Sequence, residues 1–214
     1  MEHYIAYVGQ QVSLGLMQKE YGPLFLEWAN RRIGVEGTLM RPPYSAANWD
    51  EWLTSLSNEK GRNEVFAILL HEESEGTRTY RYVGHTGIHN VRWPHGRGST
   101  GSIIGDAAAH QRGCGTEAKL NLLYHGFRVM GLRKIVSSVK AWNAPSLGHL
   151  VKCGYTVVGR YRRHVLHEGV LVDEILLEVF PEDWEPIWDA YNKSGVLPKL
   201  SPDQRALVAR ETSA

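Results

Sequence analysis

The hydrophobic pattern is clearest in the middle of the chain, where a short apolar run precedes a glycine-rich turn and an amphipathic stripe. Residues 102–105 (Ser-Ile-Ile-Gly) are typical of a short buried strand. Apolar residues then recur at helical spacing and predict one buried helix face; they are Leu120, Leu123, Phe127 and Met130. The pattern predicts a strand, a glycine turn and a helix in direct succession.

Strand-like runs and short helical patterns precede this segment. The expected strands are 11–16, 64–71 and 79–88. The expected helices are 24–31 and 46–56, the second with Ser45 as a suitable N-cap. Glycine, proline, histidine and arginine predict loops over 33–44 and 89–100. Three strands and two helices are therefore expected before the central motif.

The same alternation continues after the central motif. A strand over 134–139 leads to a helix over 144–152, for which Asn143 is a suitable cap. Two long strands, 156–166 and 170–180, are expected to form a hairpin. We expect residues 1–180 to form one α/β domain with a mixed sheet. Residues 181–214 are expected to be a helical appendage whose last helix, capped by Ser201, frays at its end.

Composition narrows the classes of function. The chain has 214 residues and a formal net charge of +1, which disfavours binding to nucleic acid or an anionic membrane surface. No apolar run approaches the roughly 20 residues that cross a bilayer. Cys114 and Cys153 have no metal or disulfide spacing, and no signal peptide is evident, so we expect a cytoplasmic protein.

The turn before the central helix has the chemistry of an anion site. Glycines let backbone N–H groups approach a ligand, and the positive end of the following helix faces it. Gly113 and Gly115 stand directly before the helical stripe. A single Gly-x-Gly is also common in ordinary strand-to-helix turns, so other motifs must decide between the two interpretations.

Several motifs, in the same order and at the same spacing, resemble the GNAT N-acetyltransferase superfamily, and within it the RimJ/RimL-type branch. The resemblance covers roughly Val12 to Trp184. The motifs that carry it are Val83–His89, Ile104–Asp106, Arg112–Ala118, Gly131–Ile135, Asn143–Ser146, Lys152–Tyr155, Gly159–Arg160 and Gly169–Asp173.

The resemblance implies a central, mostly antiparallel mixed sheet flanked by helices, with a splayed strand pair that receives acetyl-CoA. It also implies transfer of an acetyl group to a primary amine, either a protein N-terminal α-amine or a small-molecule amine. The turn would hold the CoA pyrophosphate, and strand amides the pantetheine arm and thioester oxygen. The cofactor-binding residues implied are Ile103, Ile104, Gly105, Gln111, Arg112, Gly113, Cys114, Gly115, Thr116, Asn143 and Ser146.

The chain departs from the family pattern at three customary positions, which are His110, Ser99 and Leu150. His110 replaces an Arg or Gln before the phosphate turn. Ser99 replaces a frequent glutamate base, and Leu150 replaces the tyrosine that protonates the CoA sulfur. A general acid contributes typically about 10²–10⁴ in rate, so these changes bear directly on turnover.

The remaining candidates for proton transfer each have a structural alternative. Asp106, His85 and His89 are candidate bases, although Asp106 also suits a turn-fixing role. Ser146 is a candidate acid that also suits a first-turn helix position. We treat Cys114 as a small spacer rather than a nucleophile. His85 and His89 have no third ligand at a recognisable spacing, so no metal site is expected.

Two other functions stay open. Because His110, Ser99 and Leu150 are altered together, the chain could be a non-catalytic module that binds acetyl-CoA. Trp184 and Trp188 could dock on a second subunit and make a homodimer. An aromatic and basic rim that includes Trp49 and Trp52 would suit a peptide N-terminus, an acidic peptide or a sugar-nucleotide amine better than a polycationic aminoglycoside. Tryptophans at helical spacing are, however, more often core residues.

Overall fold

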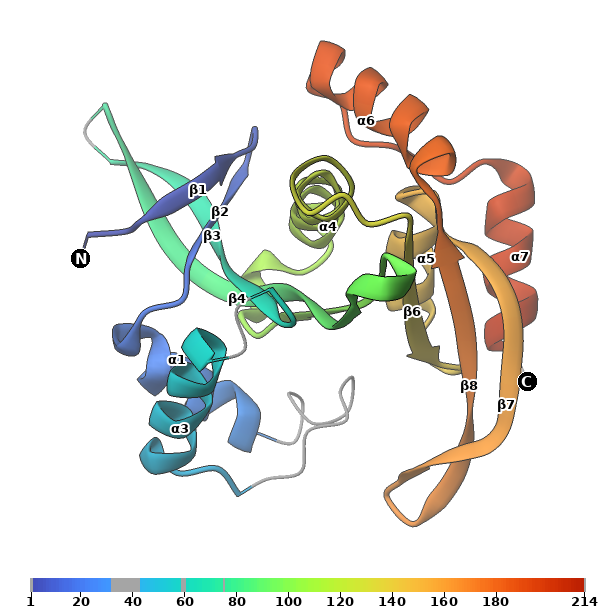
Figure 1. Cartoon of the computed structure of the whole chain (residues 1–214), viewed down its shortest axis with the longest axis horizontal. Helices are drawn as coiled ribbons and strands as arrows, with labels where there is room; N and C mark the ends of the chain where they lie inside the picture. The colour runs from blue at the N-terminus through green and yellow to red at the C-terminus, as the bar shows by residue number, and fades with distance from the viewer. Residues whose placement is uncertain (1, 32–42, 59–60, 75, 214) are drawn as a thin grey trace. The chain divides into compact units, whose positions relative to one another are not determined.

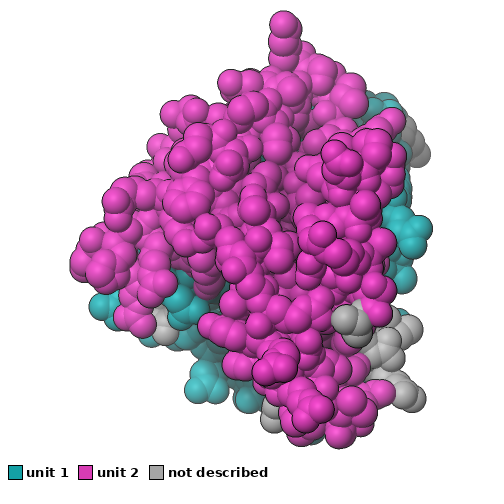
Figure 2. Space-filling view, turned by 90° about the vertical axis from the view of Figure 1, so that its right-hand side faces the viewer, with its two compact units in different colours: residues 1–91, 100–122 teal, residues 92–99, 123–214 magenta. Residues whose placement is uncertain are grey.

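The structure is a computed structural model that describes residues 2–31, 43–58, 61–74 and 76–213. Most of the loop expected over 33–44 lies outside these residues. The chain divides into two compact units (Figure 2). Unit 1 comprises residues 1–91 and 100–122, and unit 2 comprises residues 92–99 and 123–214.

Eight strands follow the order β1-β2-β3-β4-β5-β6-β8-β7 in the sheet (Figure 1). Their bounds are β1 Ile5–Val8, β2 Val12–Leu16, β3 Glu64–Ser74, β4 Thr77–Arg92, β5 Arg97–Ile104, β6 Lys134–Lys140, β7 Thr156–His167 and β8 Val170–Val179. β5 pairs with β6 in parallel, through residues 97–99 and 134–136. The neighbouring pairs β1–β2, β2–β3, β3–β4, β6–β8 and β7–β8 are antiparallel.

Unit 1 packs helices α1 (Gly22–Asn30) and α3 (Ala46–Asn58) against aromatic side chains of its strands. Ser45 caps α3, because its hydroxyl oxygen accepts from the amide of Asn48. Trp49 is 2% exposed and belongs to the core. Tyr21 and Tyr82 stack with ring centroids 4.3 Å apart. Trp49 is therefore a packing residue, as its helical spacing suggested.

Helix α4 (Cys114–Tyr124) continues into a π-helical turn over His125–Val129. In unit 2, helix α5 (Ala144–Lys152) buries Leu147 and Val151. The β7–β8 hairpin turns at Glu168 and Gly169, whose φ values of 47° and 82° are those of a tight two-residue turn. This turn joins the two strands in the hairpin that the sequence pattern predicted.

The C-terminal helices belong to unit 2. They are α6 (Pro181–Ser194) and α7 (Pro202–Thr212). Trp184 is fully buried and packs against Phe127, with ring centroids 5.5 Å apart. The tryptophan that could have docked on a second subunit is thus a core residue of its own unit.

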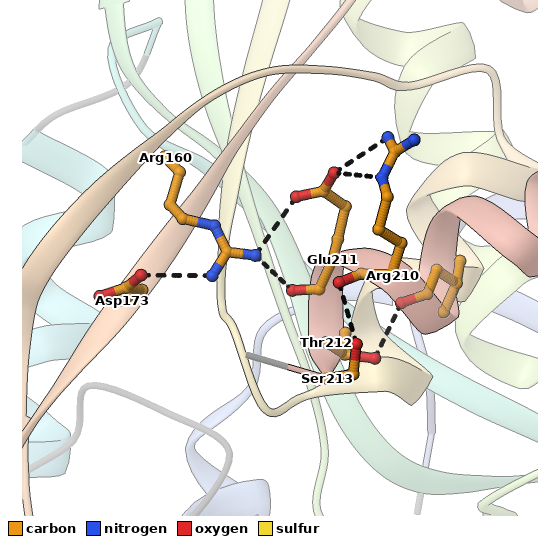
Figure 3. Close-up of polar contacts among 7 residues, drawn as sticks. Arg160, Asp173, Arg210, Glu211, Thr212 and Ser213 are labelled. Carbon is orange, nitrogen blue, oxygen red and sulfur yellow. Dashed lines mark hydrogen bonds and ion pairs between the residues drawn. The ribbon is translucent and has the colours of Figure 1, made fainter.

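Helix α7 is tied to the hairpin by a guanidinium group (Figure 3). Arg160 on β7 donates to the carbonyl oxygen and carboxylate of Glu211, and also to the carboxylate of Asp173 on β8. Ser201 and Gln204 form a capping box at the start of α7. These contacts hold the last turn of α7 at Glu211.

Sequence reasoning placed most elements within a few residues but missed two strands wholly or in part. The bounds of α5 are those expected. β5 starts at Arg97, so the prediction of a loop over 89–100 was wrong at both ends, because β4 also extends to Arg92. β1 was not predicted at all. β1 is only four residues long, and the first residues of β5 (Arg97 to Ser99) are not apolar, so neither segment gives a clear strand pattern.

Candidate active site

The turn before α4 has the backbone conformation of an anion-binding loop. Gln111 and Gly113 both have left-handed φ, 58° and 86°, on either side of Arg112. Alternating left-handed residues turn successive N–H groups to one side, and such concavities accept anions. The left-handed φ of Gln111 is costly for a non-glycine residue, and strain of this kind concentrates at functional loops. The predicted strand–turn–helix succession is present, with a short 3₁₀ turn (Ala107–Ala109) inserted before the loop.

Gly115 has open space where a side chain would stand. A Cβ atom built there would meet only the Cγ1 atom of Ile104, at 3.9 Å, among the described residues outside its own helix backbone. Packing in this structure therefore does not require glycine at this position. A close approach of a ligand to the backbone is a physical reason for glycine here.

The other residues of the loop divide between surface and core. Arg112 is exposed, whereas Cys114 and Thr116 are buried. Burial raises the pKa of the Cys114 thiol, while the nearby guanidinium of Arg112 acts in the opposite direction. The net increase keeps the thiol protonated and favours the spacer interpretation over the nucleophile.

The end of β5 is already partly hydrogen-bonded within unit 1. The amides of Gly105 and Asp106 both donate to the carbonyl oxygen of Val83, at 2.9 and 3.3 Å. The imidazole of His110 donates to the carbonyl oxygen of Ile104 at 2.8 Å. The amide of Gly105 is therefore hydrogen-bonded to β4. His110, which departs from the family pattern, is hydrogen-bonded to the end of β5.

Asp106 contacts two groups of its own unit. One carboxylate oxygen accepts from the amide of Ala108 at 2.8 Å, and the other is bound by the guanidinium of Arg81. Arg81 also contacts Glu72. A carboxylate committed to a backbone amide and an arginine is a poor proton acceptor. These contacts favour the turn-fixing role of Asp106.

The two candidate histidines of β4 have different surroundings. His85 lies among aromatic rings, with centroids 5.5 Å from Trp52 and 5.7 Å from Phe25. Burial, with a smaller contribution from the charge of His89, lowers the pKa of His85 to about 4. His85 is therefore neutral at neutral pH. The Nε2 atom of His89 is 3.7 Å from the point where a Cβ of Gly101 would stand, so this ring lies over β5.

Unit 2 carries the other predicted site residues at the start of α5. The side chain of Asn143 accepts from the amide of Ser146 at 3.1 Å, which confirms the predicted helix cap. Ser146 is half-buried. Leu150, in the customary tyrosine position, is 2% exposed and is a core residue of the unit.

Sequence reasoning assigned no role to Glu117, yet it is the most completely buried acid among the described residues. It is 0% exposed, and its carboxylate accepts from the amides of Gln10, Gln11 and Val12 in the β1–β2 turn. The only sequence signal was the glutamate within the glycine-turn motif. Its partners lie more than a hundred residues away and could not be predicted.

Two classes of site have no support among the residues that the structure describes. These residues contain no group of three or more His, Cys, Asp and Glu side chains that could hold a metal ion. Within the same residues, no helix has the length and apolar character that spanning a membrane requires.

Solved structures show which known proteins share this fold, and a family model shows the family. The chain resembles the spermidine N-acetyltransferase of Vibrio cholerae, solved with CoA and spermine, at a TM-score of 0.72 and 15% identity, over 82% of this chain and 98% of that one. It also resembles Mycobacterium smegmatis RimJ, solved with CoA-disulfide, at a TM-score of 0.69 and 20% identity, over 89% and 91%. No curated protein matches the chain. The family described as Acetyltransferase (GNAT) domain matches residues 15–156, and the chain belongs to this family of acetyltransferases.

Proposed function

We propose that this enzyme transfers the acetyl group of acetyl-CoA directly to a primary amine in a ternary complex. GNAT enzymes use acetyl-CoA, and two solved relatives carry CoA or its disulfide. The observation that carries the proposal is the loop before α4. This loop has left-handed backbone at Gln111 and Gly113, and the first turn of α4 has a glycine at 115 that packing does not require. The backbone of 111–116 would hold the pyrophosphate, and Arg112 would add positive charge.

In the proposed reaction, the nitrogen lone pair of the neutral amine attacks the thioester carbonyl carbon. The C–N bond forms, the C–S bond breaks, and the CoA sulfur leaves with the electron pair. The amides of Ile103 and Ile104 would bind the pantetheine arm and the developing oxyanion, for which one donor is worth typically about 10²–10³ in rate. The amide of Gly105 is the weaker candidate, because it donates to Val83.

Proton transfer is proposed to involve His89 and Ser146. Asp106 contacts Ala108 and Arg81, and a pKa of about 4 makes His85 a weak base. Of the two candidate bases on β4, His89 is therefore the one to test first. Ser146 is the proposed acid that protonates the leaving sulfur, and Asn143 is proposed to contact the pantetheine while it caps α5.

We propose the N-terminal α-amine of a polypeptide as the acceptor. An α-amine has a pKa near 7.8, so about 14% is neutral at pH 7, whereas about 0.04% of a lysine-like alkyl amine is neutral. The neutral fraction therefore differs by about 300-fold between the two kinds of amine. This difference favours the α-amine here, because Ser99 replaces a customary glutamate base and Asp106 is bound by Arg81. Partly exposed rings of Phe25, Trp28 and Trp52 in unit 1 would suit an apolar first residue.

A second candidate function is a module that binds acetyl-CoA without turnover. Leu150, packed in the core, supplies no acid, and Asp106 is committed to structural contacts. This function and the enzyme share the donor site and differ only in turnover.

The test is calorimetric titration with acetyl-CoA, followed by measurement of CoA thiol release with two acceptors. One is a peptide with a free N-terminus and no lysine, and the other is spermine. We expect micromolar binding of the donor and faster release with the peptide at pH 7. Binding without release would establish the module, faster release with spermine would overturn the acceptor assignment, and absence of binding would overturn the donor site.

A further inference from the structure

The side chain of Glu117 is an internal anion that fills a backbone site of unit 1. Oε2 accepts from the amides of Gln11 and Val12, at 3.1 and 2.9 Å, and Oε1 from the amide of Gln10. Three successive amides that converge on one carboxylate form a nest, which stabilises negative charge. A fully buried carboxylate is tolerated only when it is hydrogen-bonded in this way.

Gly9 allows the turn to approach the carboxylate. A Cβ at Gly9 would lie 2.7 Å from Oε1 of Glu117 and 2.5 Å from the carbonyl oxygen of Val12. The amide of Gly9 donates to that same carbonyl oxygen at 3.0 Å and closes the turn. The approach of the β1–β2 turn to α4 thus depends on the absence of a side chain at one position.

The main chain of Glu117 is bound to the phosphate loop. Its amide donates to the carbonyl oxygen of Gly113 at 3.0 Å, and its own carbonyl oxygen accepts from the side chain of Asn121 at 3.0 Å. One residue therefore contacts the β1–β2 turn through its side chain and the loop through its backbone. A displacement of the carboxylate would be passed to Gly113 through a single hydrogen bond.

Charge repulsion and loop anchoring predict opposite effects on donor binding when the Glu117 carboxylate is removed. A negative charge in the first turn of α4 repels a bound pyrophosphate, so its removal should strengthen donor binding if charge alone mattered. If the carboxylate instead holds the loop in its binding conformation, its removal should weaken donor binding. The sign of the effect separates the two roles.

We propose that Glu117 is a positioning residue for the donor site, which anchors the loop 111–116 to the β1–β2 turn so that the backbone of the loop is preorganised for the CoA phosphates. This inference rests on the proposed function, since it requires that the loop bind the donor. Glu117 itself contacts neither the phosphates nor the reacting atoms.

The test compares Glu117→Gln with the unchanged protein by calorimetric titration with acetyl-CoA and by steady-state kinetics. Gln keeps the shape but replaces one acceptor by an NH₂ group that faces donors. We expect the dissociation constant and KM for acetyl-CoA to rise roughly tenfold, the cost of a lost charged hydrogen bond, while kcat at saturating donor changes little. Unchanged or tighter binding would overturn the inference.

A second variant, Gly9→Ala, changes the same contact from the β1–β2 turn. Gly9→Ala keeps the carboxylate but pushes the turn away from it, and we expect a similar loss of affinity. If Glu117→Gln fails to fold, this variant decides the matter alone. The control is Val179→Ala on β8, in unit 2, where Val179 is fully buried. It should lower thermal stability and leave acetyl-CoA affinity unchanged below the melting temperature.

The controls also separate this inference from the proposed function. If the unchanged protein does not bind acetyl-CoA, the donor site itself is wrong. If it binds normally and Glu117→Gln and Gly9→Ala do too, only the positioning role fails. If Val179→Ala loses as much acetyl-CoA affinity as Glu117→Gln and Gly9→Ala, global destabilisation explains the loss. That result would also overturn the positioning role.

Discussion

The first turns of helices α4 and α5 have different hydrogen-bond partners. α5 satisfies its first turn itself, since the side chain of Asn143 accepts from the amide of Ser146. α4 follows Gly113 in a left-handed conformation, and its first-turn acid, Glu117, faces the β1–β2 turn. A self-capped helix start is a packing device, whereas a glycine-rich start whose acid is committed elsewhere can receive an external anion.

Gly113→Val is expected to have the largest effect on the start of α4. Its φ of 86° is unfavourable for any β-branched residue, and the side chain would occupy the approach of the phosphate. We expect acetyl-CoA affinity to fall at least about 100-fold, or about 2.7 kcal/mol, by calorimetric titration. A melting curve checks that the variant is folded at the titration temperature. Normal affinity in a folded variant would remove the loop from the donor site.

Gly115→Ala is a sharper test because fold and function should respond in opposite directions. Ala is the better helix former and meets only Ile104 at 3.9 Å, so stability should rise by up to about 1 kcal/mol. Donor binding should weaken roughly tenfold if the phosphate lies against this backbone. Stability is measured by denaturant titration and affinity by calorimetry. A variant that is more stable and binds equally well would place the phosphate elsewhere.

The smallest effect is expected at the self-capped helix. Asn143→Ala should cost about 1 kcal/mol in the free energy of unfolding, as the loss of an N-cap does. Asn143→Asp retains a capping oxygen and is the matched control, with stability near that of the unchanged protein. If donor affinity falls in both variants, the side-chain NH₂ group of Asn143 contacts the pantetheine. Equal affinity in all three proteins would leave only the cap.

The sequence could predict contacts between residues close in the chain, but not contacts between distant residues. The start of α5 was predictable because Asn143 and its partner lie three residues apart, and local side-chain capping has a local signature. The glycine turn was predictable for the same reason. The engagement of Asp106 by Arg81 and of Glu117 by the β1–β2 turn was not, since their partners are 25 and up to 107 residues away.

The strand errors have a related cause. β1 pairs with β2, and the first residues of β5 pair with β6. β1 (Ile-Ala-Tyr-Val) is apolar but only four residues long, whereas Arg97, Gly98 and Ser99 in β5 carry no apolar signal. Hydrophobic patterning detects strands in which apolar and polar residues alternate over several positions, and it misses strands that are very short or that lack apolar residues.

The contact of Arg160 with both Asp173 and Glu211 has a consequence for local opening of unit 2. One guanidinium serves the hairpin and the last turn of α7, across a separation of 51 residues (Figure 3). Detachment of α7 would leave Arg160 with Asp173 alone of these two partners, and a change of the hairpin register would remove the contact of Arg160 with the last turn of α7. We therefore expect the last turn of α7 and the part of the hairpin around Arg160 to share protection against hydrogen exchange.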